Sequence, residues 1–433
     1  MPEGVQVTAT SQFRNRIFAS CGVVVEWYDF LIYGLMATTI QRVFYPTNNA
    51  TVGLILTFAT FAVGYLARPV GGIVIGRIGD TKGRKFALLL STTLMVIPLF
   101  ITTILPTYAA IGIWAPILLT LMRLLQGFSV GGEYSGALTA LSESATQSRL
   151  GRSVSLGLVT AMAGNMLAAL VVFLVTTIGG PDALAAGTWR IPYAIGFVLA
   201  VVAVILLRKM GETESFEEAT HSGRTGSPLR ELLKDYPVAA IMMLALAIWS
   251  GVTIYTLTSW MPTYLETAVG MRSARADLTS VLISIIYIAL VVPVAILGDR
   301  RGRARLMVGT VIAYVILSVP VILLLGSGVV AAVLTAIVVL SALQTFVDTT
   351  TTTEMTQLVP TPVRYTGIAI TYSIGMIIGG FTPAIEETLI GLTHSALVPA
   401  FVLIGVSVLI IPILIALPKY LRRAQAAELL TTS

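Results

Sequence analysis

The chain has 433 residues, of which 56% are hydrophobic and only 11% are charged, and its formal net charge is +6. A soluble domain carries about 25% charged residues, so this composition excludes an ordinary water-soluble protein. The positive charge does not indicate nucleic-acid binding, because the lysines and arginines are spread over short segments between apolar runs. A single cysteine, Cys21, excludes an intrachain disulfide and a cysteine-based metal cluster.

Apolar runs of about 20 residues, the length that a membrane-spanning helix needs, recur along the whole chain. The polar N-terminal segment and the length of the first run do not fit a cleaved signal peptide. We therefore expect an all-α polytopic membrane protein. Twelve spans are predicted, at residues 17–40, 52–76, 86–105, 112–141, 152–178, 189–207, 237–262, 277–298, 305–325, 329–357, 366–392 and 396–417.

The basic residues predict the orientation of these spans. Arg68 and Arg123 fall within spans, and one set of alternate loops contains only four basic residues, Arg42, Arg190, Arg272 and Arg275. All other lysines and arginines lie on the opposite side, together with both ends of the chain. Cytoplasmic loops of membrane proteins are enriched in lysine and arginine. Both termini are therefore predicted to be cytoplasmic, which agrees with an even number of spans.

The spans are predicted to form two six-helix bundles, at residues 1–207 and 237–433. Residues 208–236 contain no apolar run and are interpreted as a cytoplasmic linker. The two halves share a loop pattern: GRIGDTKGRK at residues 76–85 corresponds to AILGDRRGRAR at residues 295–305. Each copy has an acid, two residues and then Gly-Arg. Parallel repeats of this kind build one large class of transporters.

These loops are interpreted as a latch on the cytoplasmic rim that joins the halves in one conformation. Glycine allows the backbone to reverse, and the acids can pair with neighbouring arginines or bind a helix end. The alternative is that the charges only enforce topology. Glu143 and Glu354 end the fourth and tenth spans, ahead of Arg149 and Arg152 and of Arg364, which suggests a duplicated ion-pair device. The candidate latch residues are Gly76, Asp80, Gly83, Arg84, Lys85, Glu143, Asp299, Gly302, Arg303, Glu354 and Arg364.

These motifs carry a family resemblance. GRIGDTKGRK and RLLQG (residues 123–127) resemble motifs of the major facilitator superfamily. VEWYDFLIYG (25–34), ARPVGG (67–72), IGIWAPILL (111–119), LQGFSVGGEYSGA (125–137) and WRIP (189–192) are similar to its metabolite:H⁺ symporter branch, whose members carry citrate, 2-oxoglutarate, shikimate or proline/betaine. The resemblance implies the twelve-helix fold of that superfamily, a bacterial cytoplasmic membrane, and a central cavity lined by the first, fourth, seventh and tenth spans.

Charged residues within the first and fourth spans are the main functional candidates. Glu26, Asp29 and Tyr33 share one helical face, and Arg123 and Gln126 share a face with Glu133. Intramembrane charges are costly and usually face a wet cavity. The resemblance implies one charge system, in which Glu26, Asp29 and Glu133 serve proton coupling while Arg123, Gln126 and Tyr33 bind substrate. The alternative is a structural ion pair between the two helices.

Arg68, beside Pro69 in the second span, has two equally weighted readings. It binds the substrate carboxylate or Asp29, or it satisfies helix-end carbonyls beside a proline kink.

The second half contributes further candidates for the substrate site, Trp249, Tyr255 and Asp348. Asp348 precedes five threonines, which either solvate a polar substrate, form a flexible gate or bond their own backbone. The aspartate could instead pair with Arg364. Glu386 and Glu387 receive little functional weight, because at least one of them is expected to be solvated.

We therefore expect a proton-coupled symporter that works by alternating access as a monomer in the lipid bilayer. Its substrate is predicted to be an organic acid, because Arg123 offers a bidentate clamp for a carboxylate. The alternative is a zwitterionic osmolyte such as proline or betaine, with cation–π contacts from Trp249 and Tyr255. No cofactor, metal or enzymatic activity is expected, since the chain has two histidines and no phosphate-binding glycine loop. A channel is the remaining alternative.

Overall fold

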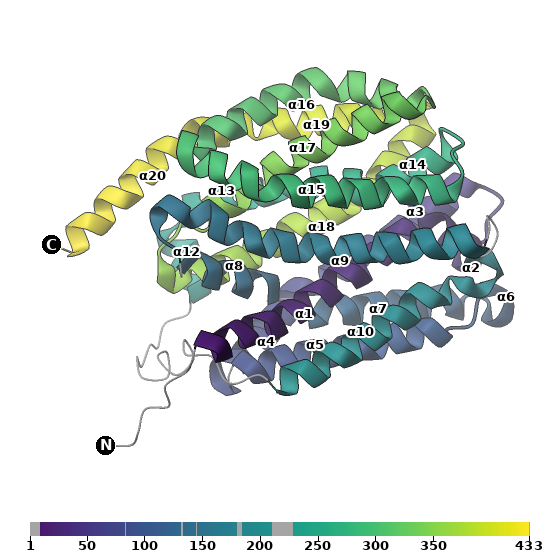
Figure 1. Ribbon diagram of the computed structural model, residues 1–433, viewed down its shortest axis with the longest axis horizontal. Helices are drawn as coiled ribbons and strands as arrows, with labels where there is room; N and C mark the ends of the chain where they lie inside the picture. Colours follow the sequence, from purple (N-terminus) through teal and green to yellow (C-terminus); the bar gives the residue numbers. More distant parts are fainter. Residues whose placement is uncertain are drawn as a thin grey trace.

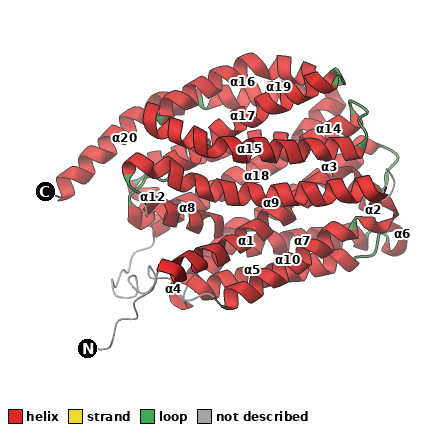
Figure 2. Cartoon of the chain, viewed as in Figure 1, coloured by secondary structure: helices red, strands yellow, loops and turns green. Residues whose placement is uncertain are grey.

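The structure is a computed structural model that describes residues 9–82, 84–130, 133–143, 145–179, 184–209 and 228–432. Every regular element within these residues is helical (Figure 2). The helices lie side by side along the long axis of the molecule (Figure 1). The predicted all-α fold is therefore confirmed.

The first half of the chain contains α1 (Ala9–Leu35), α2 (Ala37–Phe44), α3 (Ala50–Leu66), α4 (Arg68–Lys82), α5 (Arg84–Ile104), α6 (Tyr108–Ile111), α7 (Trp114–Ser129), α8 (Glu133–Glu143), η1 (Gln147–Arg149), α9 (Leu150–Gly179), η2 (Leu184–Thr188) and α10 (Arg190–Arg208). The second half contains α12 (Pro228–Asp235), α13 (Pro237–Tyr255), η3 (Thr256–Trp260), α14 (Met261–Thr267), α15 (Ser273–Arg301), α16 (Arg303–Gly326), α17 (Val330–Met355), α18 (Thr361–Thr393), α19 (Val398–Leu409) and α20 (Ile411–Thr432).

The predicted spans appear at the expected places. In the described part of the chain, 11 helical stretches are long and apolar enough to cross a membrane, and α1 with α2, bent by 67°, makes a twelfth. Three spans contain breaks that the hydrophobic pattern did not indicate. The first bends at Met36, the seventh passes through the π-helical segment η3, and the twelfth is interrupted at Ile410, between α19 and α20. Length and apolarity locate a span but do not reveal local departures from α-helical geometry.

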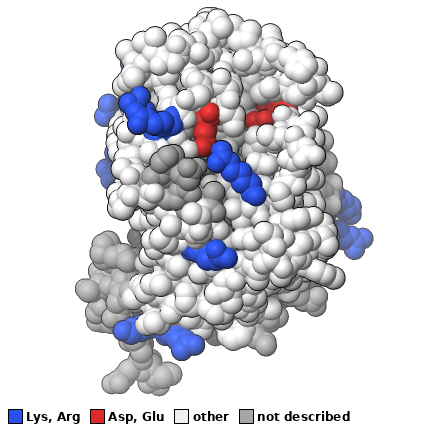
Figure 3. Space-filling model, turned by 90° about the vertical axis from the view of Figure 1, so that its right-hand side faces the viewer, with Lys and Arg blue, Asp and Glu red and all other residues white. Residues whose placement is uncertain are grey.

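The start of α1 and the end of α20 lie at one end of the bundle, on the left of Figure 1, together with α12. We call this the terminal end. The opposite end, where α2, α6 and α14 lie, is called the far end. Figure 3 faces the far end and shows a surface that is mostly uncharged, with scattered basic side chains and fewer acidic ones. Large apolar side chains are exposed along the helices, as expected for surfaces that contact lipid; examples are Ile73, Leu323 and Leu409.

The two halves of the chain meet along two long helix pairs. The first pair is α9 with α15, and the second is α3 with α18. Within the first half, α1 packs on α9 and α5 on α10. Within the second, α13 packs on α18 and α16 on α17.

Glycines allow very close packing next to the second span. A Cβ atom on Gly127 would lie 1.6 Å from the carbonyl oxygen of Gly64, and one on Gly71 would lie 1.8 Å from that of Phe128. The second span is interrupted at Ala67, between α3 and α4 and two residues before Pro69. This packing holds α7 against α3 and α4, so that residues of the second and fourth spans can meet α1.

Candidate functional site

Glu26 of α1 forms a buried ion pair with Arg68, the first residue of α4. Arg68 Nη2 lies 3.0 Å from Glu26 Oε1, and the two residues are 4% and 0% exposed. The guanidinium also lies over the rings of Phe30 and Tyr65, at 4.5 and 4.8 Å from their centroids. Of the partners considered from the sequence, Asp29 is wrong, because the guanidinium pairs with Glu26; binding of a substrate carboxylate by Arg68 stays a prediction.

Asp29, one turn further along α1, takes a different partner. Gln126 Nε2 of α7 donates to Asp29 Oδ1 over 2.8 Å, and the charge of Arg123 also acts on this carboxylate. The helical faces of the first and fourth spans therefore meet, as their spacing indicated. However, the predicted single charge system is divided, because Glu26 pairs with Arg68 instead of Arg123.

Arg123 is 1% exposed and lies over the ring of Tyr33, 4.0 Å from its centroid. Its two terminal nitrogens have no hydrogen-bond partner among the described residues. Tyr33 itself donates to the backbone oxygen of Thr57 over 3.1 Å. Glu133, the remaining predicted member of this system, begins α8, and its side chain lies outside the described part of the structure. A buried guanidinium with free donors is suited to bind an anion or a carboxylate.

Asp348 of α17 is the main charged group of the second half, and it is 6% exposed. Three side chains from three helices donate to it: Ser250 Oγ at 2.6 Å, Tyr287 OH at 2.9 Å and Gln344 Nε2 at 2.9 Å. The suggested pairing with Arg364 is wrong, since Arg364 lies 3.8 Å from Glu143. No basic side chain among the described residues forms an ion pair with Asp348. Asp348 is thus a buried carboxylate held by neutral donors.

The threonines that follow Asp348 are all buried. Thr350, Thr351 and Thr353 donate to carbonyl oxygens of their own helix, so this part of the strip satisfies itself. Thr352 instead lines a central cavity. One of the five hydroxyls is therefore placed to contact a substrate.

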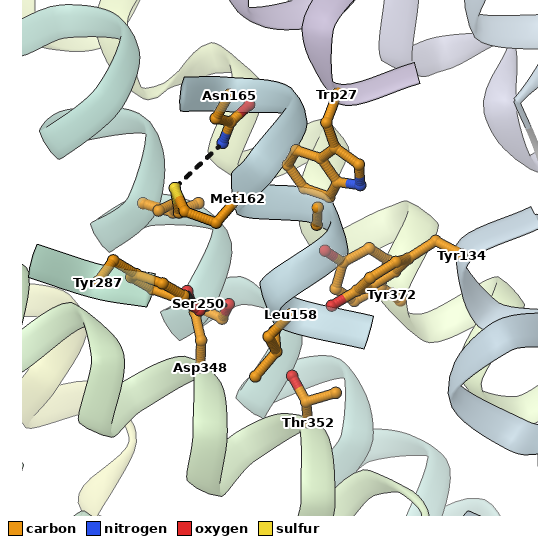
Figure 4. A pocket seen from close by; sticks show the side chains of 12 residues that line it. Trp27, Tyr134, Leu158, Met162, Asn165, Ser250, Tyr287, Asp348, Thr352 and Tyr372 are labelled. Carbon is orange, nitrogen blue, oxygen red and sulfur yellow. Dashed lines mark hydrogen bonds between the residues drawn. The ribbon is translucent and has the colours of Figure 1, made fainter. Parts of the chain in front are cut away.

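The cavity lies between the two halves (Figure 4). Its volume is about 20 Å³, which is room for about one water molecule. Trp27 and Tyr134 pack edge to face with centroids 5.7 Å apart, and the ring of Tyr372 lies 5.1 Å from that of Tyr134. Twelve residues line the space: Trp27, Tyr134, Leu158, Ala161, Met162, Asn165, Ser250, Ile254, Tyr287, Asp348, Thr352 and Tyr372.

Two unsatisfied polar atoms belong to residues that line the cavity. Trp27 Nε1 and Asn165 Oδ1 have no hydrogen-bond partner among the described residues. Buried polar groups are rarely left without partners. The lining residues therefore carry one unused donor and one unused acceptor, in addition to the carboxylate of Asp348. Within the described residues, no group of three or more histidine, cysteine, aspartate or glutamate side chains could hold a metal ion.

Of the seven predicted substrate residues, Asp348 lines this cavity and six do not: Tyr33, Arg68, Arg123, Gln126, Trp249 and Tyr255. Trp249 Nε1 donates to Ser407 Oγ of α19 over 3.1 Å, and Tyr255 OH donates to Tyr65 OH. The aromatic residues that do line the cavity, Trp27, Tyr134, Tyr287 and Tyr372, were missed by the sequence analysis. Trp27 and Tyr134 stand inside the quoted motifs VEWYDFLIYG and GGEYSGA, so a signal was present. Tyr287 and Tyr372 are isolated aromatics in long apolar runs and gave no signal.

The terminal end carries the candidate latch. Arg303 donates to Glu354 Oε1 at 2.9 Å and to Asp299 Oδ1 at 3.2 Å. Asp299 also accepts from the backbone N–H groups of Gly151 and Arg152, at 2.9 and 3.2 Å, which begin α9 in the other half. Asp299 therefore connects the second half to the amino end of a helix in the first, where a negative charge is favourable.

The remaining latch candidates differ in their surroundings, and some of them lie outside the described residues. Glu143 lies nearest to Arg364 of the opposite half and not to the arginines that follow it in sequence. Gly302 has a φ of 91°, as expected for a glycine that reverses the chain between two helices. Lys85 makes an interaction at the start of α5. Gly83 lies outside the described residues, as do the side chains of Asp80 and Arg84, and Gly76 lies within α4.

Hydrogen bonds also bridge the halves at the far end. Thr38 Oγ1 donates to Glu266 Oε2 over 2.8 Å, and Thr176 Oγ1 donates to Asp277 Oδ2 over 2.6 Å. The pair α9 and α15 is therefore tied near both of its ends. The cavity lies between these two sets of ties, which join the halves at the terminal end and at the far end alike.

Comparisons with known proteins agree with this arrangement. Residues 19–383 match the family model described as Major Facilitator Superfamily. The chain is 32% identical over 403 residues to a proline/betaine transporter of Salmonella typhimurium, covering 90% of this chain and 80% of that protein. It is 31% identical over 418 residues to a glycine betaine/proline/ectoine/pipecolic acid transporter of Dickeya dadantii, covering 94% of this chain and 83% of that protein.

Solved structures show the same fold. A structure of the proton:xylose symporter XylE with a bound bromodeoxyglucose has a TM-score of 0.74 at 15% identity, covering 95% of this chain and 96% of that one. A partially occluded, inward-open form of XylE from E. coli has a TM-score of 0.73 at 15% identity, covering 95% and 98%. The chain is a multi-pass membrane transporter and not an enzyme, and it belongs to the major facilitator superfamily.

Proposed function

We propose that this transporter carries a small zwitterion of the proline and betaine class together with protons. The observation that carries the proposal is the pairing of a buried carboxylate, Asp348, with the aromatic rings of Trp27, Tyr134, Tyr287 and Tyr372 around one cavity. A carboxylate and aromatic faces together attract an ammonium group, and aromatic cages are the usual sites for quaternary ammonium ligands. The names of the relatives from Salmonella and Dickeya support the same class.

The organic acid favoured by the sequence has less support. A di- or tricarboxylate entering this cavity would meet the negative charge of Asp348, which has no cationic partner among the described residues. Like charges in a poorly hydrated site repel strongly. A zwitterion avoids this repulsion by placing its positive end at Asp348 and its carboxylate elsewhere.

The carboxylate end is proposed to bind Arg68. The charge of this arginine acts on Tyr372, which lines the cavity, and its guanidinium lies against Tyr65. Arg123 is the second candidate, because its terminal nitrogens have no hydrogen-bond partner among the described residues; neither arginine lines the cavity itself. Gln126 and Tyr33 are proposed to act indirectly. Gln126 donates to Asp29, and the ring of Tyr33 lies against the guanidinium of Arg123.

Proton coupling is proposed to follow from competition for Arg68. If the substrate carboxylate takes the place of Glu26 on Arg68, Glu26 becomes a buried carboxylate without a cation and binds a proton. Inward movement of that proton gains about 2.3 kcal/mol per 100 mV of membrane potential. Asp29 keeps Gln126 as a donor and is the second candidate carrier, with Glu133 the third.

Transport is proposed to proceed by rocking of the two bundles, at residues 1–207 and 237–433, about the enclosed cavity. The ties at the terminal end and those at the far end would open alternately. The terminal end is proposed to face the cytoplasm, since most basic residues of the loops lie there. The carrier is proposed to act as a monomer, because both halves that form the cavity belong to one chain.

A selectivity measurement on purified protein tests the substrate class. Thermal unfolding is followed with proline, glycine betaine, citrate, 2-oxoglutarate and shikimate, and each compound is then tested for exchange across proteoliposomes. Stabilisation and exchange by proline or betaine, and by none of the three acids, support the proposal. Stabilisation by an acid with no response to either zwitterion contradicts it and restores the organic-acid assignment.

A further inference from the structure

Glu386 and Glu387 lie in α18 toward the far end, and neither is solvated. Glu386 is 0% exposed and Glu387 is 7% exposed. The expectation that one of them faces water is therefore wrong, because both side chains turn into the protein. Two adjacent buried carboxyl groups in a membrane-spanning helix require a physical explanation, since each is expensive in its charged form.

The two carboxyl groups are not equally satisfied. Trp260 Nε1 donates to Glu387 Oε1 over 2.9 Å, and Thr256 Oγ1 donates to Glu386 Oε1 over 2.8 Å. The second oxygen of Glu386, Oε2, is buried and has no hydrogen-bond partner among the described residues. A fully buried carboxylate with one neutral donor and one bare oxygen is unfavourable, whereas the neutral acid is not. Oε2 is the oxygen that can carry a proton.

No basic group among the described side chains offsets a charge on Glu386. Among the elements that pack on α18, α3 and α13 carry one ionisable side chain each, Tyr65 and Tyr255, and these bond each other. The segments η3 and α19 carry none. Arg68, at the start of α4, is held by Glu26. The ionisable side chain whose charge acts on Glu386 within the described residues is the neighbouring acid, Glu387.

The charges of α8 and α12 lie far away along α18. These helices contact its beginning, where Gly136 of α8 meets Tyr365 and Leu232 of α12 meets Gly367. At a rise of about 1.5 Å per residue, Glu386 is roughly 30 Å further along the helix. Those charges therefore cannot compensate an ionised Glu386.

The donors to the two acids are the first and last residues of η3. Thr256 begins this π-helical segment and Trp260 ends it, so consecutive carboxyl groups of α18 hold both of its ends. π-Helical turns inside α-helices are rare and are frequent at functional sites. The two carboxyl groups of α18 therefore hold the π-helical segment of the seventh span.

The segment η3 also contacts the first half of the chain. It packs on α1, where a Cβ atom on Gly34 would lie 3.0 Å from Ser259 Oγ. The hydroxyl of Ser259 is buried and unpartnered within the described part of the chain. Opening of the far end would separate α1 from η3 and admit water to the space behind them, where Glu386 lies.

We propose that Glu386 is a proton-binding site of this transporter, separate from the carboxylates of α1. It holds a proton on Oε2 while α1 and η3 are in contact, and it exchanges that proton with the outer solution when they separate. The inference rests on the proposed function for its role in proton-driven uptake, but the presence of the proton can be measured without any substrate.

The transport arm of the test compares Glu386→Gln with Glu387→Gln in proteoliposomes. The neighbouring acid is a matched control, because it is also buried and keeps a donor of its own. For each protein, proline or betaine uptake driven by an inward proton gradient is divided by exchange of the same compound without a gradient. We expect E386Q to lower this ratio at least about tenfold and E387Q to leave it near that of the parent. An unchanged ratio in E386Q overturns the proposal.

The infrared arm uses purified full-length protein at neutral pH without substrate. A protonated carboxyl group has a carbonyl stretching band that a carboxylate lacks. The proposal expects one such band that disappears in E386Q and persists in E387Q. If E386Q does not reach the membrane, Glu386→Asp takes its place and should shift the band. Absence of a band assigned to Glu386 contradicts the proposal.

The two arms separate the possible failures. If the parent takes up neither zwitterion, or if a proton gradient does not drive its uptake, the proposed function fails, and the infrared arm alone decides whether Glu386 holds a proton. If transport is proton-driven but the Glu386 band is missing, the proposed function stands and the proton site is wrong.

Discussion

Glu26 of the first span and Arg68 of the second form a buried ion pair, with 3.0 Å between Oε1 and Nη2. Taking both charges out of water is expensive, so such a pair is weak evidence for a role in stability. A pair that a substrate carboxylate can break is instead useful for coupling.

Replacement of Glu26 by glutamine tests this use of the pair. Glu26→Gln retains an oxygen that can accept from Arg68 but cannot bind and release a proton. We expect uptake driven by a proton gradient to fall at least about tenfold relative to exchange without a gradient, a change equivalent to 1.4 kcal/mol. The measurement is radiolabelled uptake in proteoliposomes. Equal loss in both assays would point to a structural ion pair, the alternative considered for these charges.

Replacement of Asp348 by asparagine tests the cation site. The amide keeps partners for Ser250, Tyr287 and Gln344 but loses the negative charge. Charged hydrogen bonds contribute about 1.5–3 kcal/mol, so the dissociation constant for betaine should rise roughly tenfold or more. Isothermal titration calorimetry measures it. Asp235→Asn, at an exposed position in α12, is the control and should bind like the parent.

Replacement of Arg303 by glutamine tests the latch at the terminal end. The variant removes the charged donor that joins Glu354 to Asp299, and it weakens the hold of Asp299 on the start of α9. Loss of one charge-assisted hydrogen bond shifts the ratio of open to closed molecules by about tenfold. The fraction of molecules in which the two halves are apart at the terminal end should therefore increase.

Spin labels on cysteines introduced at Ser148 and Arg305, in a chain with Cys21 replaced by serine, report this separation as a distance distribution. Arg301→Gln is the matched control, because Arg301 is exposed at the end of the same loop. A distribution for R303Q that matches that of the control would show that the charges enforce topology only.

Substitution of Gly127 by alanine tests the close packing that brings α7 to α1. The added Cβ would lie 1.6 Å from the carbonyl oxygen of Gly64, so the helices must move apart. Overpacking of this kind costs about 1–3 kcal/mol, and the midpoint of thermal unfolding in detergent should fall. Gly405→Ala in α19, where nothing lies within 4 Å of the new atom, should leave the midpoint unchanged or raise it.

The fold was predictable because its main determinant is simple. A span needs a run of apolar residues of one length, and all twelve runs are visible in the sequence. Departures within spans, such as η3, depend on tertiary partners like Glu386 and Glu387, which come from a segment more than a hundred residues away. No local pattern reports such partners.

The site was predictable only in part. Helical spacing placed Asp29 and Gln126 on the polar faces of their own helices, and these two faces meet in the structure. The partner of Glu26 depends on how a third helix, α4, approaches α1, and the sequence contains no measure of that approach. Trp27 and Tyr134 were missed because an aromatic residue in an apolar run has the same appearance whether it packs in a core or lines a cavity.

The most direct test of the account measures proton uptake and betaine uptake together in proteoliposomes containing the purified chain, with proline as a second substrate. The account predicts that adding betaine outside, without an imposed gradient, draws protons inward together with the substrate, and that Glu26→Gln takes up betaine without this proton signal. Saturable betaine uptake by the parent that moves no protons at any imposed pH difference would contradict it.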